Sequence, residues 1–95
     1  MKIHVVIGIL TIGVGWFFSI STTEWCLVTL SIALVMSAEG FNTAVEHLTD
    51  LASPNYHPLA GKAKDVAAGA VLLAAIGAAI VGLFIFLPYV ITYFG

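Results

Sequence analysis

The chain has 95 residues, of which 61% are hydrophobic and only 8% are charged. Soluble domains carry about 25% charged residues, so this chain has too few to cover a water-facing surface. A net charge of −2 with three basic residues argues against nucleic acid as a partner. The single cysteine excludes an internal disulfide and a cysteine-based metal site. The composition predicts an integral membrane protein.

Three uncharged apolar stretches predict membrane-spanning helices over about residues 3–20, 25–47 and 66–93. A helix rises about 1.5 Å per residue and needs about 20 residues to cross about 30 Å of hydrocarbon. A membrane β-barrel would need many alternating segments, which this sequence does not contain. The predicted fold class is therefore all-α, with one membrane domain over residues 1–95 and a polar connection over about residues 48–65.

The basic residues predict how the chain is oriented in the membrane. Lys2 precedes the first predicted span, and Lys62 and Lys64 lie in the polar connection. Basic residues concentrate on the cytoplasmic side. The N-terminus and the polar connection are therefore expected in the cytoplasm, and the C-terminus outside.

Small residues recur at four-residue spacing in the third predicted span, at Ala70, Ala74, Ala78 and Gly82. Small residues at this interval let helices approach closely in lipid. Packing among the three helices of one chain explains the pattern, and so does packing between copies in an oligomer. The motif does not distinguish these alternatives.

Acidic and amide side chains form a stripe on the second predicted helix, at Glu39, Asn42, Thr43, Glu46 and Asp50. At about 100° per residue, Glu46 and Asp50 lie about 20° to either side of Glu39. The other two residues lie within about 60° of Glu39. All five share one face if the helix continues to Asp50.

This stripe is costly unless something neutralises it. A carboxylate at membrane depth costs about 2.5–3.5 kcal/mol, so Glu39 is a functional candidate. Glu46 and Asp50 are expected at a helix C-terminus, where the helix dipole is already negative. Carboxylate and amide oxygens are ligands of Mg²⁺, which also keeps substrate phosphates in its shell. A solvated helix end is the alternative explanation for Asp50.

Basic residues near the expected start of the third helix are candidates for binding phosphate. Lys62 and Lys64 would lie beside a helix N-terminus, which favours anions, although orientation of the chain explains them equally. Asp65 is expected to cap that helix. Tyr56 and His57 are candidates for lining a nucleotide pocket, or for anchoring the chain at the membrane interface.

Three classes of function compete for these observations. Phosphoryl transfer needs positioning, Mg²⁺ and a group that accepts the hydroxyl proton, and Glu39 has the depth of a lipid headgroup hydroxyl. A structural membrane protein explains the hydrophobicity and the small residues but leaves Glu39 unexplained. A cation carrier would require polar residues on several spans. The sequence therefore favours a lipid kinase.

Two segments, EGFNTAVEHLTD (residues 39–50) and YHPLAGKAKD (residues 56–65), carry a resemblance to a known family. With AAGAV at residues 67–71, they resemble the prokaryotic diacylglycerol kinase and undecaprenol kinase family. The resemblance implies a bacterial inner (plasma) membrane enzyme with three spans per subunit. It also implies a homotrimer with shared active sites, and transfer of the ATP γ-phosphate to a lipid hydroxyl with Mg²⁺.

The same resemblance implies roles for individual residues. The position of Glu39 is similar to that of the family's catalytic base, and the position of Glu46 is similar to that of a metal ligand. The residues similar to nucleotide-binding positions are Asn42, Glu46, Tyr56, His57, Lys64 and Asp65, with Asp50, Thr43 and Lys62 as additional candidates. Family members carry an amphipathic surface helix, with a second metal-binding glutamate, before the first span. This sequence begins within the tail of that segment, so a shortened start, impaired catalysis and an inactive or structural relative are the alternatives.

Overall fold

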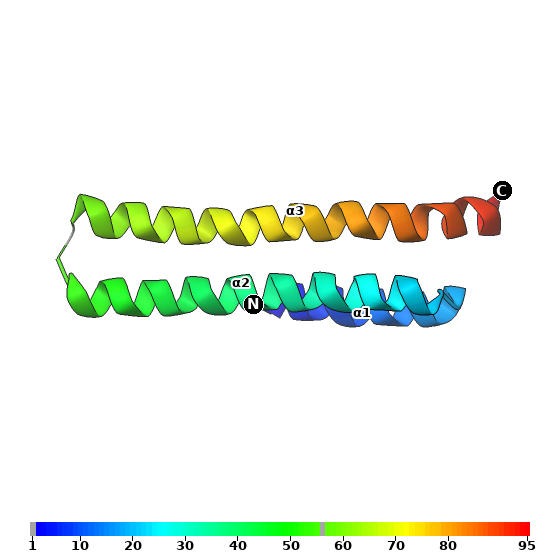
Figure 1. Ribbon diagram of the computed structural model, residues 1–95, viewed down its shortest axis with the longest axis horizontal. Coiled ribbons are helices and arrows are strands. Elements are labelled where there is room, and N and C mark those ends of the chain that lie inside the picture. Colours follow the sequence, from blue (N-terminus) through cyan, green and yellow to red (C-terminus); the bar gives the residue numbers. More distant parts are fainter. Residues whose placement is uncertain (1, 56) are drawn as a thin grey trace.

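The computed structural model describes residues 2–55 and 57–95, and these form three helices (Figure 1). Helix α1 covers Lys2–Phe18, α2 covers Thr22–Ala52 and α3 covers Pro58–Phe94. The chain reverses after α1, so that the first part of α2 runs back along α1. Helix α3 then runs antiparallel to α2 along its length. The molecule is 56 Å long and only 20 Å by 17 Å across. The all-α prediction is confirmed.

Two of the three helices, α2 and α3, are long and apolar enough to cross a membrane. Helix α1 has 17 residues, which is the lower end of the range of about 17–25 that a span requires. Large apolar side chains on all three helices are exposed, including Trp16 at 81% and Phe84 at 80%. A core helix of a soluble protein would be mostly buried. These exposed apolar faces are those of a protein embedded in lipid.

A tight turn joins α1 to α2 and sets where α1 lies. Ser19 adopts a left-handed backbone conformation with φ of 53°. The Ser21 hydroxyl accepts a hydrogen bond from the Glu24 amide at 3.2 Å, and the Glu24 carboxylate accepts one from the Ser21 amide at 2.9 Å. This reciprocal capping box defines the start of α2. The Tyr89 hydroxyl also donates to Glu24, so α3 is tied to the same end of the hairpin.

Close packing at this end holds α1 against α2. Ile20 of the turn forms a buried cluster with Val28 of α2 and Ile85 of α3, and partly buried side chains of all three helices pack against it. Gly15 is buried, and a Cβ there would lie 3.0 Å from side-chain atoms of Ile20 and Trp25. The lack of a side chain at Gly15 therefore permits the close approach of α1 to α2.

Helix α3 begins earlier than the sequence predicted. His57 is the N-cap residue, and its Nδ1 accepts a hydrogen bond from the Leu59 amide at 3.1 Å. Pro58 occupies the first turn, where its fixed φ suits a helix and its missing N–H removes no bond. The expectation that Asp65 caps this helix is wrong, because Asp65 lies within it. Both long helices thus extend into the segment expected to be the polar connection, and only residues 53–57 separate them.

An apolar groove of about 300 Å³ lies between the three helices. Its lining includes the small residues Ala75, Ala78, Ala79 and Gly82 of α3 and the side chains of Ile7 and Ile32. Of the four-residue repeat, Ala74 is buried, and a Cβ on Gly82 would meet no atom within 4 Å. Part of the repeat therefore packs within the chain, and part forms the floor of this groove.

Candidate active site

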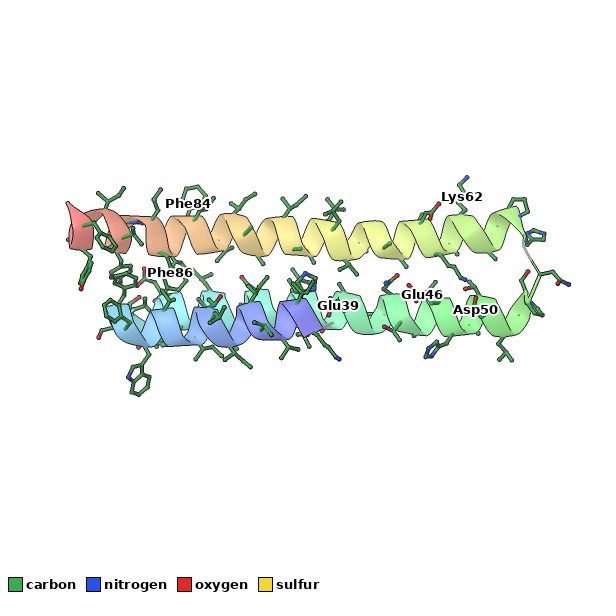
Figure 2. All side chains as sticks on the ribbon, turned by 180° about the vertical axis from the view of Figure 1, so that it is seen from behind. Glu39, Glu46, Asp50, Lys62, Phe84 and Phe86 are labelled. Atoms are coloured by element: carbon green, nitrogen blue, oxygen red, sulfur yellow. The ribbon has the colours of Figure 1, made fainter. Side chains whose placement is uncertain are left out.

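The acidic stripe lies on the face of α2 that is turned toward α3. Helix α2 continues without interruption past Asp50 to Ala52. Glu46 and Asp50 project into the space between the two long helices, and Glu39 lies beside the start of α1 (Figure 2). Glu39 is 8% exposed and is the buried charged residue of the described chain, whereas Glu46 and Asp50 are exposed. The stripe thus runs from a covered position beside α1 to an open helix end.

Glu39 is bound by a residue that the sequence analysis did not select. The Nδ1 of His4, in the first turn of α1, hydrogen-bonds to Oε1 of Glu39. The two residues are 35 positions apart, so no local motif connects them. The one available signal was the short connection between the first two predicted spans, over residues 3–20 and 25–47, because a short connection places two helices side by side and antiparallel.

Asn42 and Glu46 form a pair one helical turn apart. The Asn42 side-chain amide donates to Glu46 Oε1 at 3.2 Å. The side-chain oxygen Oδ1 of Asn42 is buried and has no hydrogen-bond partner among the described residues. A buried polar oxygen without a partner requires an explanation such as an ion. The pair therefore combines an exposed carboxylate, which projects toward α3, with a buried amide oxygen.

These oxygens fit Mg²⁺ as a partial ligand set. Within residues 2–55 and 57–95 no group of three or more His, Cys, Asp or Glu side chains is placed to hold a metal ion. Mg²⁺ is commonly held by one or two carboxylates together with substrate phosphates and waters. Glu46 and Asn42 are suited to that kind of site, and not to a site enclosed by protein ligands alone.

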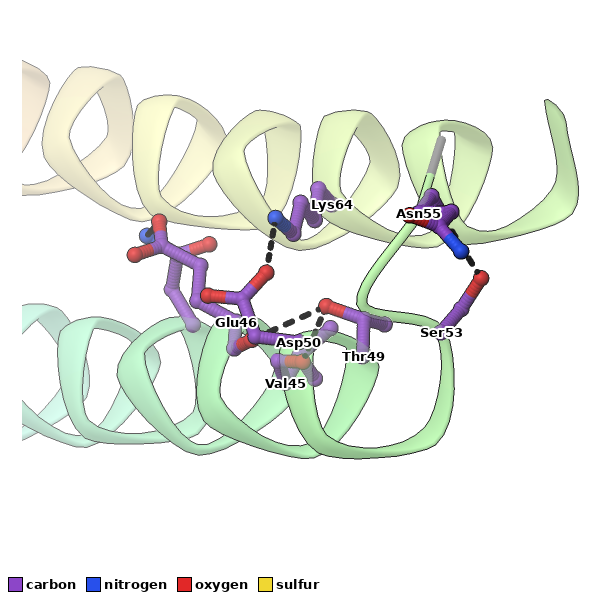
Figure 3. A network of polar contacts seen from close by, with 8 residues as sticks. Val45, Glu46, Thr49, Asp50, Ser53, Asn55 and Lys64 are labelled. Carbon is purple, nitrogen blue, oxygen red and sulfur yellow. Dashed lines mark hydrogen bonds and ion pairs between the residues drawn. The ribbon is translucent and has the colours of Figure 1, made fainter. Parts of the chain in front are cut away.

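Asp50 and Lys64 join α2 to α3. The Lys64 ammonium donates to Asp50 Oδ1 at 2.5 Å. The side chains are 65% and 39% exposed, so solvent screens the pair and its contribution to stability is at most about 1 kcal/mol. In Figure 3 this contact lies next to Thr49, whose hydroxyl donates to the Val45 carbonyl at 2.9 Å. Because the pair is weak, a phosphate can compete with Asp50 for the lysine.

A second, small pocket of about 190 Å³ lies beside this ion pair. Asp50, Ser53, His57 and Lys64 are among its lining residues. His57, predicted to line a nucleotide pocket, and Lys64, predicted to bind phosphate, therefore share one pocket at the end where α2 and α3 are connected. Tyr56 precedes this helix start but lies outside the described residues.

The remaining candidates are not part of these contacts. Lys62 is exposed and points away from α2 (Figure 2). Thr43 is exposed on α2, and Asp65 is exposed on α3. The structure thus brings together three pairs, His4 with Glu39, Asn42 with Glu46, and Asp50 with Lys64.

Comparison with known proteins adds the family to this geometry. Residues 1–86 match the sequence profile of the family described as prokaryotic diacylglycerol kinase. The chain belongs to this family. An undecaprenol kinase of Bacillus subtilis (strain 168) is 47% identical over 74 residues, which are 78% of this chain and 60% of that protein. A diacylglycerol kinase of Synechocystis is 43% identical over 88 residues, 92% of this chain and 50% of that protein.

More distant members of the prokaryotic diacylglycerol kinase family match the same core. A diacylglycerol kinase of Escherichia coli (strain K12) is 35% identical over 72 residues, which are 76% of this chain and 59% of that protein. The chain spans between half and three fifths of the length of these relatives. The family resemblance derived from the residue 39–50 and 56–65 segments is confirmed.

Proposed function

We propose that this chain forms the membrane part of a lipid kinase that transfers the γ-phosphate of ATP to the hydroxyl of a membrane lipid alcohol, with Mg²⁺. The observation that carries the proposal is a buried acid, Glu39, on the same face of α2 as the Asn42–Glu46 pair and Asp50. Relatives named undecaprenol kinase and diacylglycerol kinase support this class of reaction. The acceptor is one of these two kinds of lipid alcohol.

Glu39 is the base in this proposal. Its carboxylate accepts the proton of the lipid hydroxyl while the hydroxyl oxygen forms a bond to the γ-phosphorus. The bond between that phosphorus and the β–γ bridging oxygen breaks, and ADP leaves with its electron pair. Catalysis of phosphoryl transfer depends mainly on positioning and charge stabilisation, so a small site on one helix face is sufficient to contribute both.

Glu46 and the Asn42 carbonyl oxygen would hold Mg²⁺, which would neutralise charge on the β- and γ-phosphates. Lys64 would contact the same phosphates after leaving Asp50. His57 would line the adjacent nucleotide pocket. This order places the nucleotide at the open end of the stripe and the lipid hydroxyl at its buried end.

Lys64 and Lys62 provide a matched test of the phosphate contact. Replacing Lys64 by methionine is expected to raise the KM for ATP about 10-fold, because a hydrogen bond to a charged group contributes about 1.5–3 kcal/mol. Replacing Lys62 by methionine removes the same charge from a side chain that points away, and KM is expected to change little. Steady-state kinetics over a range of ATP concentrations measure both. Equal changes in the two variants would contradict a specific contact.

The apolar groove is the place for the hydrocarbon of the lipid. It is lined by His4, next to Glu39, and extends between the helices to Phe86. Its lining is almost entirely apolar, and a volume of about 300 Å³ is in the range of small-ligand sites. A lipid in the groove would bring its hydroxyl to the buried carboxylate.

Filling the groove tests this placement. Gly82→Leu is expected to raise the KM for the lipid about 10-fold or more with little change in the KM for ATP, because the added side chain would occupy groove volume. Gly77→Leu is the control, since Gly77 is also free of atoms within 4 Å but does not line the groove. If Gly82→Leu changes the oligomeric state and leaves the lipid KM unaltered, the groove is a contact between copies.

The proposal also includes the topology and assembly expected from the sequence. ATP is cytoplasmic, so the helix ends that carry Asp50 and Lys64 face the cytoplasm and the C-terminus faces outside. All three helices span the inner membrane of a bacterium. A homotrimer would cover the exposed apolar faces and complete the partial metal site, which one chain does not enclose.

The deciding experiment measures transfer of phosphate from radiolabelled ATP to undecaprenol and to diacylglycerol by the purified full chain in detergent micelles, with and without Mg²⁺. Phosphorylation of either lipid that depends on Mg²⁺ supports the proposal. A folded, assembled protein that phosphorylates neither lipid would contradict it and favour the inactive or structural relative.

A further inference from the structure

His4 is the side chain from another helix that contacts the buried acid. It lies in the first turn of α1, whereas Glu39 lies near the middle of α2. The bond joins His4 Nδ1 to Glu39 Oε1, and the two side chains are 28% and 10% exposed. This inner, apolar-walled location contrasts with the exposed Asp50–Lys64 pair.

We propose that His4 is a positioning residue, which orients the Glu39 carboxylate toward the lipid hydroxyl. The inference rests on the proposed function, in which Glu39 is the base. It assigns a catalytic consequence to α1, a helix that otherwise contributes apolar packing to the site.

The chemistry of the two groups defines the direction of the bond. An ionised carboxylate only accepts hydrogen bonds, so Nδ1 of His4 carries the proton and donates it to Oε1. A donor on this oxygen restricts rotation of the carboxylate about its terminal bond, which is otherwise broad. A base with its own orienting partner is a recurring arrangement in active sites. The orientation of Glu39 is therefore coupled to the position of α1.

The hairpin gives this bond its precision. The buried Gly8, a turn after His4, packs against Ile32, with 3.8 Å from an ideal Cβ position to two side-chain carbons. The buried Gly15 packs more closely near the turn, where an ideal Cβ position lies 3.0 Å from side-chain atoms of Ile20 and Trp25. Because α1 contacts α2 through these two glycines, the first turn of α1 has a fixed position along the axis of α2. Sites supported by rigid elements keep their side chains in productive geometry.

Three variants test the role. His4→Ala is expected to lower kcat about 10- to 100-fold while both KM values change little, because misorientation of a reacting group has effects of this size. His4→Asn is expected to restore most of the rate, since its side-chain amide nitrogen lies near the position of Nδ1 and also donates. His47→Ala is the control, because His47 is an exposed histidine on α2. Its kcat is expected to match that of the unmodified chain.

Combining His4→Ala with Glu39→Gln separates positioning from general damage. Residues that act as a unit are non-additive, so His4→Ala is expected to change the residual rate of Glu39→Gln by no more than about twofold. A further loss similar to that in the unmodified chain would overturn the inference. Wild-type kcat in His4→Ala, with Glu39→Gln inactive, would overturn this inference alone. Full activity of Glu39→Gln would instead contradict the base assignment in the proposed function.

A readout that does not depend on His4 variants comes from ¹⁵N NMR of histidine-labelled full chain in detergent. The ¹⁵N shift of His4 is expected to show a protonated Nδ1 that changes when Glu39 is replaced by glutamine. An unprotonated Nδ1, or a shift that is insensitive to Glu39→Gln, would overturn the proposal even if His4→Ala fails to fold.

Discussion

Replacing Glu39 by glutamine is expected to lower kcat by about 10²–10⁴-fold, which is the usual contribution of a general base. Glutamine has nearly the same size and accepts a hydrogen bond, but it does not take the proton of the lipid hydroxyl. The KM for ATP is expected to change little, because the proposed nucleotide site is at the open end of the stripe, beside Asp50 and Lys64. Initial rates at saturating lipid and ATP measure the effect.

Glu24→Gln is the matched control for this variant. Glu24 lies on the same helix, at the turn, and is bonded to Ser21 and Tyr89. A glutamine at this position of a capping box still accepts the Ser21 amide, so helix α2 keeps its start. We expect unchanged kcat. If Glu24→Gln and Glu39→Gln reduce the rate equally, loss of an acid anywhere on α2 is the cause, and Glu39 is not the base.

The second large effect is expected at Glu46. Glu46→Gln is expected to raise the Mg²⁺ concentration for half-maximal activity about 10- to 100-fold, because the variant removes one of the few charged ligands that the proposed Mg²⁺ site would have. The Asn42 amide donates to Glu46 Oε1 and would donate equally to a glutamine oxygen, so local structure is kept. Titration of initial rate with Mg²⁺ at fixed ATP measures the change.

Asp50→Asn distinguishes ligation from general surface charge. It removes the same charge one turn further along α2, from a carboxylate that Lys64 already neutralises in part. The Mg²⁺ requirement is expected to rise by no more than about threefold, since the Asp50 charge is already paired with Lys64 and is exposed to solvent. Equal increases for Glu46→Gln and Asp50→Asn would contradict a ligand role for Glu46.

The acidic stripe could be predicted from the sequence because it depends only on the repeat of one α-helix. The positions of Glu39, Glu46 and Asp50 share a face whenever the chain is helical, and apolar context made a helix the expected element. The expected membrane depth of Glu39 also followed from the uncharged stretch that precedes it. These inferences needed no knowledge of the neighbouring helices.

The start of α3 was predicted incorrectly because two helix-start signals compete in the same segment. Asp65 suits a cap, but Pro58 suits the first turn and His57 supplies a capping nitrogen. The earlier start extends α3 opposite the end of α2. Lys64 therefore lies within α3, on the face that contacts Asp50, whereas Lys62 points away from α2.

The amino-acid order alone determined the membrane class, the helical elements and the row of carboxylate and amide side chains, since these follow from composition and from the repeat of a single helix. Only the packing of the helices decided which residues meet across them. His4 contacts Glu39 because the turn at Ser19 and the glycine contacts of α1 fix the position of α1 along the axis of α2. Such a relation arises from three-dimensional packing and has no local signature in the chain.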